Sequence, residues 1–296
     1  MTPLQRSGAR AAPWFLLPAL ALLGVFVVWP LIRFLLWSFG DVPLLAPDRA
    51  VPVGLDNYSD LIADPRFRRS FLNTALFALM VVPVQTAGAF LLALWVNRPE
   101  PAWRWLRTVF FVPVIVSMPV LAVLWTLLYQ PAQPGGQGPI NALLSLVGVP
   151  PHAWLRDPTL ALPALAFMSV WQGIGLQMMV FLSGLQSVPA ELLDAAKIDG
   201  AGPVRRILHV IVPSLRNTII FVVTVTTILA FRLFAQPYLM TRGGPGNSTR
   251  SLIQTLYETT FIEQDLGRAS AGAFLFLAVV ALITWLQRAV SREERS

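Results

Sequence analysis

Few side chains in this sequence could take part in acid–base or nucleophilic chemistry. The chain has no cysteine and only two histidines, His152 and His209, so disulfides, thiolate nucleophiles and thiolate metal ligands are excluded. Its only lysine, Lys197, follows an alanine, so the Gly-Lys pair of an ATP-binding phosphate loop is missing. The four Gly-x-Gly pairs lack the third glycine of a dinucleotide-binding loop. We therefore predict no metal, no cofactor and no ATP hydrolysis by this chain alone.

The remaining polar residues with a chemical use are mostly amides and hydroxyls inside long apolar runs. Such groups must face protein or water, because hydrocarbon penalises each of them by roughly a few kcal/mol. Neutral donors and acceptors beside aromatic faces suit carbohydrate hydroxyls, and Trp171 beside Gln172 fits that chemistry. The candidates for a substrate path are Asn73, Gln85, Ser117, Ser169, Gln172, Gln177, Thr226, Arg232 and Gln236.

Arg232 differs from the other candidates because it carries a charge. A guanidinium inside a membrane span is penalised by roughly several kcal/mol unless it is paired or hydrated. No span contains an Asp or Glu that could pair with it. Two interpretations remain open: Arg232 binds a substrate hydroxyl or anionic group, or it lies near the outer end of its span and reaches water.

The elements that must position these residues are membrane-spanning helices. Mean hydropathy is +0.64 and only 12% of the residues are charged, which is typical of a chain in a bilayer. Crossing the hydrocarbon takes about 20 apolar residues. We predict an all-α integral membrane protein, a single transmembrane domain over residues 1–296. Its six spans are expected at residues 14–39, 71–96, 108–130, 160–186, 215–240 and 269–290. The first run lacks a cleavage pattern and is interpreted as an uncleaved span.

Orientation follows from the basic residues, which are retained on the cytoplasmic side near span ends. With the N-terminus inside, the cytoplasmic segments hold twelve basic and six acidic residues, a net charge of +6. The external segments hold eight basic and nine acidic residues, a net charge of −1. Both termini are therefore predicted to be cytoplasmic, with the spans surrounded by membrane lipid. The overall charge of +7 is explained by topology and does not indicate a nucleic-acid partner.

The lack of acids in the spans also bears on the source of energy. Carriers driven by protons commonly place an Asp or Glu in a span to take up the ion. Sodium can instead be held by backbone carbonyls, so the argument is stronger against proton coupling than against sodium coupling. The sequence favours an energy source on another protein.

The polar stretch between the fourth and fifth runs has the local signals of two short helices. Ser187 is predicted to cap the first, with Pro189 in its first turn, and Gly200 is predicted to end it in a positive-φ turn. A second helix is expected to begin at Pro203, and Pro213 is expected to mark the turn back into the membrane. Taken by itself, this stretch could also be an amphipathic loop in the lipid headgroup layer.

The same stretch resembles the cytoplasmic EAA loop of ABC importer permeases. Asp194, Ala195 and Ala196 fall on the Glu-Ala-Ala of that loop, and Gly200 falls on its glycine. The resemblance implies that residues 187–213 form a coupling loop that docks into a cleft of an ATPase subunit. The coupling residues are then Glu191, Asp194, Ala195, Ala196, Asp199, Gly200 and Pro213.

Two further segments resemble the sugar permeases of the maltose and glycerol-3-phosphate type, and the first of their two permease subunits in particular. They are "VGLDNYSDLIADPRFRRSFLNTALF" from Val53 and "TRGGPGNST" from Thr241. The resemblance implies a second homologous permease, an ABC ATPase dimer and an external sugar-binding protein as partners. It also implies substrate contacts at Ser169, Gln172, Gly173 and Thr226. The predicted substrate path is Ser169, Trp171, Gln172, Gly173, Gln177, Thr226, Arg232 and Gln236.

We therefore predict a permease subunit of an ATP-driven importer for a di- or oligosaccharide, without catalytic residues. One alternative is an independent secondary carrier. The other is a membrane enzyme acting on lipids, which is disfavoured because no cluster of His, Asp and Glu lies near a span end in the sequence.

Overall fold

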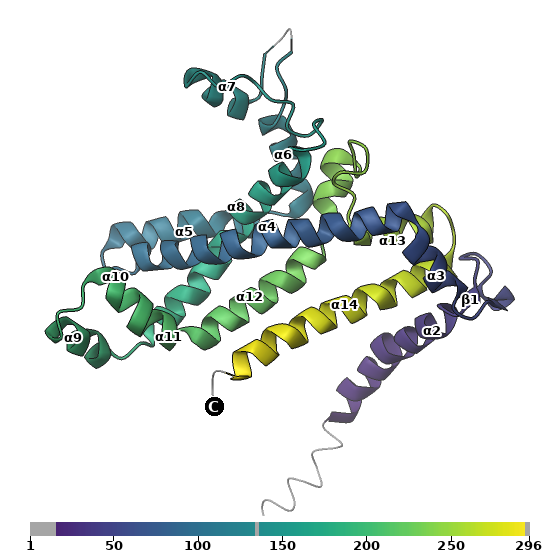
Figure 1. Ribbon diagram of the computed structural model, residues 1–296, viewed down its shortest axis with the longest axis horizontal. Helices are drawn as coiled ribbons and strands as arrows, with labels where there is room; N and C mark the ends of the chain where they lie inside the picture. The colour runs from purple at the N-terminus through teal and green to yellow at the C-terminus, as the bar shows by residue number, and fades with distance from the viewer. Residues whose placement is uncertain (1–15, 134–135, 294–296) are drawn as a thin grey trace, which may run out of the picture. The chain divides into compact units, whose positions relative to one another are not determined.

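The computed structural model describes residues 16–133 and 136–293, and the chain forms two compact units. The first unit comprises residues 1–64 and 256–278, and the second comprises residues 65–255 and 279–296. Helices dominate both units (Figure 1). The integral membrane class is confirmed, whereas the single transmembrane domain stays a prediction.

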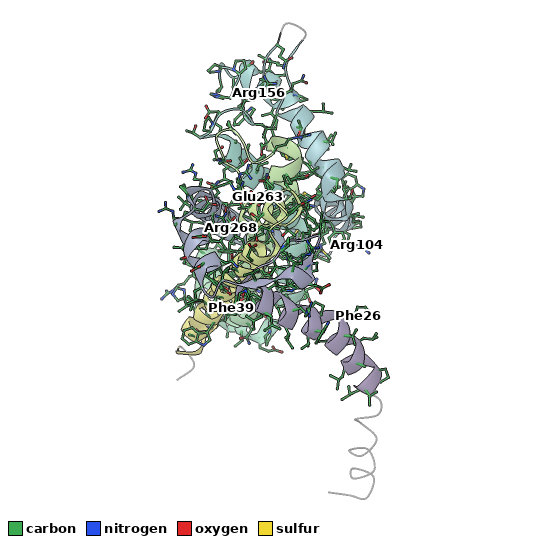
Figure 2. All side chains as sticks on the ribbon, turned by 90° about the vertical axis from the view of Figure 1, so that its right-hand side faces the viewer. Phe26, Phe39, Arg104, Arg156, Glu263 and Arg268 are labelled. Atoms are coloured by element: carbon green, nitrogen blue, oxygen red, sulfur yellow. The ribbon has the colours of Figure 1, made fainter. Side chains whose placement is uncertain are left out.

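The first unit begins with a helix over Leu16–Trp37, of which no part is buried. It contains a π-helical turn, η1 (Gly24–Val28), followed by α2 (Trp29–Trp37). Phe26 is 72% exposed and projects from this helix (Figure 2). An apolar surface of this extent must be covered by lipid or by another protein. Residues 14 and 15 of the predicted first span lie outside the described residues, as does the N-terminus.

A short hairpin and a helix complete the N-terminal part of this unit. β1 (Gly40–Asp41) pairs antiparallel with β2 (Val51–Pro52), and the 3₁₀ turn η2 (Pro47–Arg49) connects them. α3 (Asp56–Ala63) follows. Asn57 donates hydrogen bonds from Nδ2 to the carbonyl oxygens of Ser38 and Gly40, at 3.1 and 2.9 Å, and thereby ties α3 to the start of the hairpin.

The second unit has a core built from three long helices, α4 (Pro65–Val96), α8 (Ala161–Gln186) and α12 (Arg216–Phe231). Small residues let these helices approach closely, as is usual between membrane helices. The core is made by Ala89, Ala93, Val96, Met178, Phe181, Leu182, Leu185, Leu215 and Val222.

The predicted third span, 108–130, is two helices in the structure. α5 (Pro101–Ile115) and α6 (Met118–Leu128) meet at an angle of 101°. Pro119 has no N–H to donate to the carbonyl of Ile115, but it is tolerated in the first turn of a new helix. The apolar run therefore continues while the helix does not. α7 (Pro139–Leu146) lies in the following loop.

The predicted fifth span, 215–240, is also broken. α12 ends at Phe231, and an irregular stretch leads to the π-helical turn η4 (Pro237–Thr241). Pro237 is again accommodated in the first turn of the new element. Residues 232–234 are outside helical structure at this break, and residues 232–236 line a cavity.

The remaining long helices agree with the predicted spans in position. α4, α8 and α14 (Leu266–Glu293) cover the predictions 71–96, 160–186 and 269–290. α13 (Leu252–Phe261) precedes α14. Within the described residues, four helices are long and apolar enough to cross a membrane, or up to six elements if each of two bent helix pairs is one span. The count of six spans stays a prediction.

Candidate functional site

A polar cavity of about 260 Å³ lies in the second unit, bordered by α4, α8, α12 and the break after α12. Its walls combine amide and hydroxyl groups with apolar residues such as Phe77 and Phe234. Nothing in the local sequence separates these two phenylalanines from the others in apolar runs, so sequence reasoning missed them. Six of the residues predicted for the substrate path line this cavity: Ser169, Gln172, Gly173, Thr226, Arg232 and Gln236.

Helical spacing explains the contribution of α8. Ser169, Gln172 and Gly173 are three and four residues apart, so they share one face of the helix. Trp171 lies on another face, where its ring packs edge-on against Trp125 with centroids 5.4 Å apart. Trp171 therefore does not line this cavity, because adjacent helical residues point about 100° apart.

A hydrogen-bond network ties the break after α12 to α8. Gln236 is buried and donates from Nε2 to Ser169 Oγ at 2.7 Å. Ser169 Oγ in turn donates to the carbonyl of Leu165 at 2.9 Å. Gln177, predicted for the path, donates instead to Thr226 Oγ1 from a neighbouring position and does not line the cavity. This hydrogen bond orients Thr226, which does line the cavity.

Gly173 has a steric role in this wall. A Cβ at this position would lie 2.3 Å from Nε2 of Gln85, a buried amide that also lines the cavity. Only glycine leaves room for the Gln85 side chain in its present position. Gln85 was a candidate from its sequence position on α4, and the structure brings it to the cavity.

Arg232 is the charged residue of this cavity. It is the C-cap of α12, and its side chain is exposed. The described part of the chain gives that side chain neither an ion pair nor a hydrogen bond. The carbonyl end of α12 favours a positive charge at this position. The structure thus places Arg232 at a helix end that borders a cavity, and not inside a continuous span.

Two other candidates lie away from the cavity. Asn73 is buried and donates from Nδ2 to the carbonyls of Asn247 and Arg250, at 2.7 and 3.0 Å. It supports the loop after η4. Ser117 is exposed and precedes α6 at the break between α5 and α6.

The predicted coupling segment forms α9 (Ala190–Ile198), α10 (Pro203–Arg206), η3 (Ile207–Ile211) and α11 (Val212–Ser214). It connects the end of α8 to the start of α12, and in Figure 1 it lies far from α7 of the same unit. No residue of α9 is buried. Its surface is therefore available to a partner.

The end of α9 is a Schellman motif. Gly200 has a φ of +75°, as predicted. Its N–H donates to the carbonyl of Lys197 at 3.1 Å, and the N–H of Ala201 donates to the carbonyl of Ala196 at 2.9 Å. Asp199 is the C-cap, and its N–H bonds to the carbonyl of Ala195. The last two alanines of the predicted motif thus accept the bonds that close the helix.

The charged residues of α9 lie on its exposed surface. Glu191 is in the first turn, where the positive end of the helix dipole favours an acid. Asp194 pairs with Lys197 at 2.7 Å, with both side chains more than half exposed. An exposed pair of this kind contributes little to stability. These carboxylates can therefore be offered to a partner at a small energetic cost.

Two details of this segment differ from the predictions. Ser187 does not cap α9: it is the C-cap of α8, its Oγ donates to the carbonyl of Gly184, and Pro189 is the residue before α9. Pro213 does not mark the turn into the membrane, because it lies inside α11 and the 73° bend comes at Leu215. The wider π-helical turn η3 precedes Pro213 and relieves the clash with the carbonyl four residues earlier.

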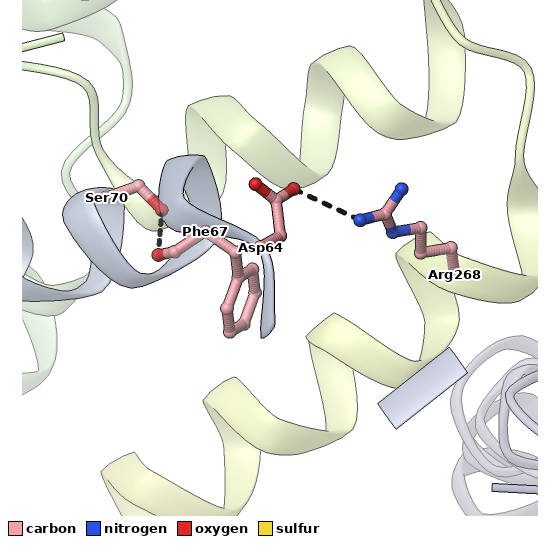
Figure 3. A network of polar contacts seen from close by, with 4 residues as sticks. All are labelled: Asp64, Phe67, Ser70 and Arg268. Carbon is pink, nitrogen blue, oxygen red and sulfur yellow. Dashed lines mark hydrogen bonds and ion pairs between the residues drawn. The ribbon is translucent and has the colours of Figure 1, made fainter. Parts of the chain in front are cut away.

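The two other segments that resemble sugar permeases, one leading into the second predicted span and one after the fifth, contain polar residues that stabilise the fold. In the first unit, Asp64 pairs with Arg268 of α14 at 3.1 Å (Figure 3). In the second unit, Thr249 Oγ1 lies 2.7 Å from Thr241 Oγ1 and donates to the carbonyl of Gly244 at 2.8 Å. Among the described residues, no three His, Asp or Glu side chains come together as metal ligands would.

Residues 61–296 match the family described as binding-protein-dependent transport system inner membrane component. The chain is similar to the probable ABC transporter permease protein YurN of Bacillus subtilis, with 34% identity over 278 residues that cover 92% of this chain and 93% of that protein. It is also similar to the sulfoquinovosyl glycerol transport system permease protein SmoG of Agrobacterium fabrum, with 31% identity over 271 residues, 91% of this chain and 86% of that protein.

A solved structure has the same fold. A chain from the crystal structure of a bacterial ABC transporter involved in the import of alginate superposes with a TM-score of 0.82, covering 99% of both chains. The sequences are only 19% identical, so this likeness supports the architecture and carries no argument about substrate.

Proposed function

Because this chain belongs to the family of binding-protein-dependent transport system inner membrane components, we propose that it is one permease subunit of an ATP-driven importer of a di- or oligosaccharide. It forms the translocation path together with a second, homologous permease. An ATPase pair supplies the energy, and an external sugar-binding protein delivers the substrate. The permease itself catalyses no reaction and opens alternately to the two sides of the membrane.

One connection in the structure carries this proposal. The exposed segment α9–α11 joins α8 to α12, and these same two helices supply Ser169, Gln172 and Thr226 to the cavity wall. A displacement of α9 by a partner is transmitted directly to both helices, because helices are stiff along their axes. ATP-driven movement at the segment can therefore change access to the cavity.

The chemistry of the cavity supports a saccharide. Gln85, Gln172, Ser169 and Gln236 present neutral donors and acceptors, which match the hydroxyl groups of a sugar. The relative SmoG is named for the transport of sulfoquinovosyl glycerol, a sugar glycoside. We extend the saccharide class, though not that particular substrate, to this chain.

The proposed orientation places both termini and the segment α9–α11 in the cytoplasm of a bacterium with an inner membrane. This rests on the charge distribution of +6 on that side against −1 on the other. Glu191, Asp194, Ala195, Ala196, Asp199, Gly200 and Pro213 belong to the proposed coupling segment.

A pair of glycine substitutions tests the coupling role. Gly200 and Gly202 are both exposed, and an added Cβ would meet no atom within 4 Å at either position. Gly200 has a φ of +75°, whereas Gly202 has a φ of −65°. Gly200→Val should therefore distort the end of α9 at a cost of about 1–2 kcal/mol, while Gly202→Val is tolerated by the backbone. The two sites thus match in exposure and in free space, and they differ in the backbone conformation of the glycine that is replaced.

We expect Gly200→Val to reach the membrane in normal amount but to lose labelled-saccharide uptake and ATPase co-purification. Asp194→Lys should act similarly, because it reverses the charge offered to the ATPase. Gly202→Val should transport like the parent. Parental uptake by both Gly200→Val and Asp194→Lys would contradict the coupling role, and failure to recover an ATPase with the unmodified permease would contradict the importer assignment itself.

A further inference from the structure

The charged residues that line two polar cavities of the second unit are arginines. Arg232 lines the cavity described above. A second cavity of about 520 Å³ is lined by Arg156 and Arg242, together with uncharged polar residues such as Tyr129 and Gln130. Among the described residues that line these two cavities there is no Asp or Glu. The walls therefore carry positive charge only.

Unlike Arg268 and Arg107, these three arginines have no partner of their own in the described part of the chain. Arg268 pairs with Asp64, and Arg107 donates from Nη2 to the carbonyl of Val96 at 2.6 Å. Within the described part of the chain, the side chains of Arg156, Arg232 and Arg242 form neither ion pairs nor hydrogen bonds. Their donors remain available to a ligand.

The acid next to Arg156 is already engaged. Asp157 accepts hydrogen bonds at Oδ1 from the N–H and Oγ1 of Thr159, at 2.7 and 2.6 Å. These bonds hold the pKa of the Asp157 carboxyl below its ordinary value. Asp157 therefore stays ionised, but in the described part of the chain it forms no ion pair with Arg156.

The two cavities follow the same two segments of the chain. Met118 and Ala235 line the first cavity, and Thr126 and Thr241 line the second, so both run along α6 and along the stretch from α12 to η4. Eight helical residues separate Met118 from Thr126, which corresponds to about 12 Å along α6. Arg156 lies at the level of α7, beyond the end of α6 (Figures 1 and 2). The cavity lined by Arg232 and the cavity lined by Arg156 and Arg242 thus follow the same two segments of the chain.

We propose that the transported saccharide carries an anionic group, a carboxylate, sulfonate or phosphate ester, which binds to Arg232 after being attracted by Arg156 and Arg242. This inference rests on the proposed function. The positive charge of a guanidinium attracts such oxyanions, and its N–H groups form charge-assisted hydrogen bonds with them. A cavity lined by charge of one sign also concentrates ligands of the opposite sign.

A neutral saccharide would offer the three arginines no group of opposite charge to bind. The amides and hydroxyls of the first cavity already match sugar hydroxyls, and a neutral ligand would leave the exposed Arg232 side chain without a counter-charge. The anionic group supplies that counter-charge during transport.

The first experiment identifies the substrate as the saccharide that cells no longer take up when the permease gene is deleted. The parent strain and a strain lacking the permease gene are given a mixture of oligosaccharides, and consumption is followed by mass spectrometry. The mixture contains matched pairs that differ in charge: sulfoquinovosyl glycerol with glucosyl glycerol, cellobiouronic acid with cellobiose, and lactose 6-phosphate with lactose. It also contains oligosaccharides from acidic and neutral polysaccharides.

We expect the deletion to prevent consumption of an anionic member of the mixture and to spare its neutral counterpart. If only neutral saccharides depend on the permease, the anionic inference is overturned while the proposed function stands. If no saccharide depends on it, the proposed function is overturned and the inference with it.

The second experiment tests Arg232 in the complete importer in cells. For the anionic substrate, Arg232→Gln should raise the KM for uptake at least tenfold, whereas Arg232→Lys should stay within about threefold of the parent, because it keeps the charge. Arg104→Gln is the control, since it removes an exposed positive charge of α5 that lines neither cavity. Membrane levels of all variants are measured by immunoblot.

Substitutions of Arg156 and Arg242, which line the second cavity, should have effects on uptake that depend on salt concentration. Arg156→Gln and Arg242→Gln should lower the uptake rate at low ionic strength and have less effect at high ionic strength, where long-range attraction is screened. Equal losses for Arg232→Gln and Arg232→Lys, at normal membrane levels, would indicate that the shape of Arg232 matters and not its charge, and would overturn the assignment.

Discussion

Asn73 illustrates how a polar side chain in an apolar run can serve the fold and not the substrate. Its amide donates to two carbonyl groups of the loop after η4, those of Asn247 and Arg250. The next residue, Thr74, accepts a hydrogen bond from the N–H of Leu252 at Oγ1, at 2.9 Å. Both side chains are buried. Together they fasten the start of α13 to α4.

We predict that Asn73→Leu destabilises the protein, because it preserves volume while leaving a buried position without its amide and two part-buried carbonyls without their donor. The expected loss is roughly 2 kcal/mol or more, which corresponds to a fall of about 4–8 °C in the midpoint of thermal unfolding. The measurement is thermal unfolding of the detergent-solubilised protein. Gln186→Leu, an amide deletion at an exposed position at the end of α8, should leave the midpoint unchanged. A similar midpoint for both variants would contradict the structural role of Asn73.

At the scale of elements, glycines determine how closely α5 and α8 pack. A Cβ at Gly175 would lie 1.9 Å from the carbonyl oxygen of Phe110 in α5, so any side chain must push the two backbones apart. A Cβ at Gly88 of α4 would lie 2.9 Å from the tip of Ile174, which can move. At Gly24 it would meet nothing within 4 Å. The three positions form a graded series.

We predict that alanine substitutions follow this order in their effect on folding. Gly175→Ala should cost about 1–3 kcal/mol through overpacking, Gly88→Ala should cost less, and Gly24→Ala should be neutral or slightly stabilising. The readouts are the amount of permease recovered from the membrane and its midpoint of thermal unfolding. A tolerated Gly175→Ala would show that α5 does not pack this closely on α8 in the membrane.

Prolines act on the same scale by changing the kind of helix around them. The π-helical turns η1 and η3 precede Pro30 and Pro213, and in each case a helix continues through the proline. Where the chain breaks instead, at Pro119 and Pro237, a new element begins with the proline in its first turn. Proline is thus accommodated within a continuing helix at two positions and starts a new helical element at two others.

At the scale of the whole molecule, the proposed orientation can be tested because the chain has no cysteine of its own. Ser187 and Ser145 are both exposed, Ser187 at the start of the coupling segment and Ser145 in α7. In intact spheroplasts, an impermeant thiol reagent should label Ser145→Cys but not Ser187→Cys. After permeabilisation both should be labelled, and the parent should never be. Labelling of Ser187→Cys alone in intact spheroplasts would reverse the topology and remove the coupling segment from the ATPase side.

Several conclusions could be reached from the sequence alone because they depend on local physics. Long apolar runs predict membrane helices wherever they occur, so the ends of α4, α8 and α14 were located to within six residues. The positive φ of Gly200 also follows locally, because a helix that ends there needs a left-handed residue.

Other properties depend on contacts between residues distant in the chain, and only the tertiary structure decided them. Ser169 and Gln236 meet across 67 positions, and Asn73 reaches Asn247 across 174. In sequence, Gln177, Gln236 and Asn73 are equivalent amides in apolar runs. They acquire different roles because the end of α12 at Phe231 turns the following residues toward α8, and an unbroken apolar run does not record where its helix stops. Packing against distant helices supplies the energy that fixes that point, so a cavity-wall residue, a supporting amide and a loop anchor could not be told apart before the fold was known.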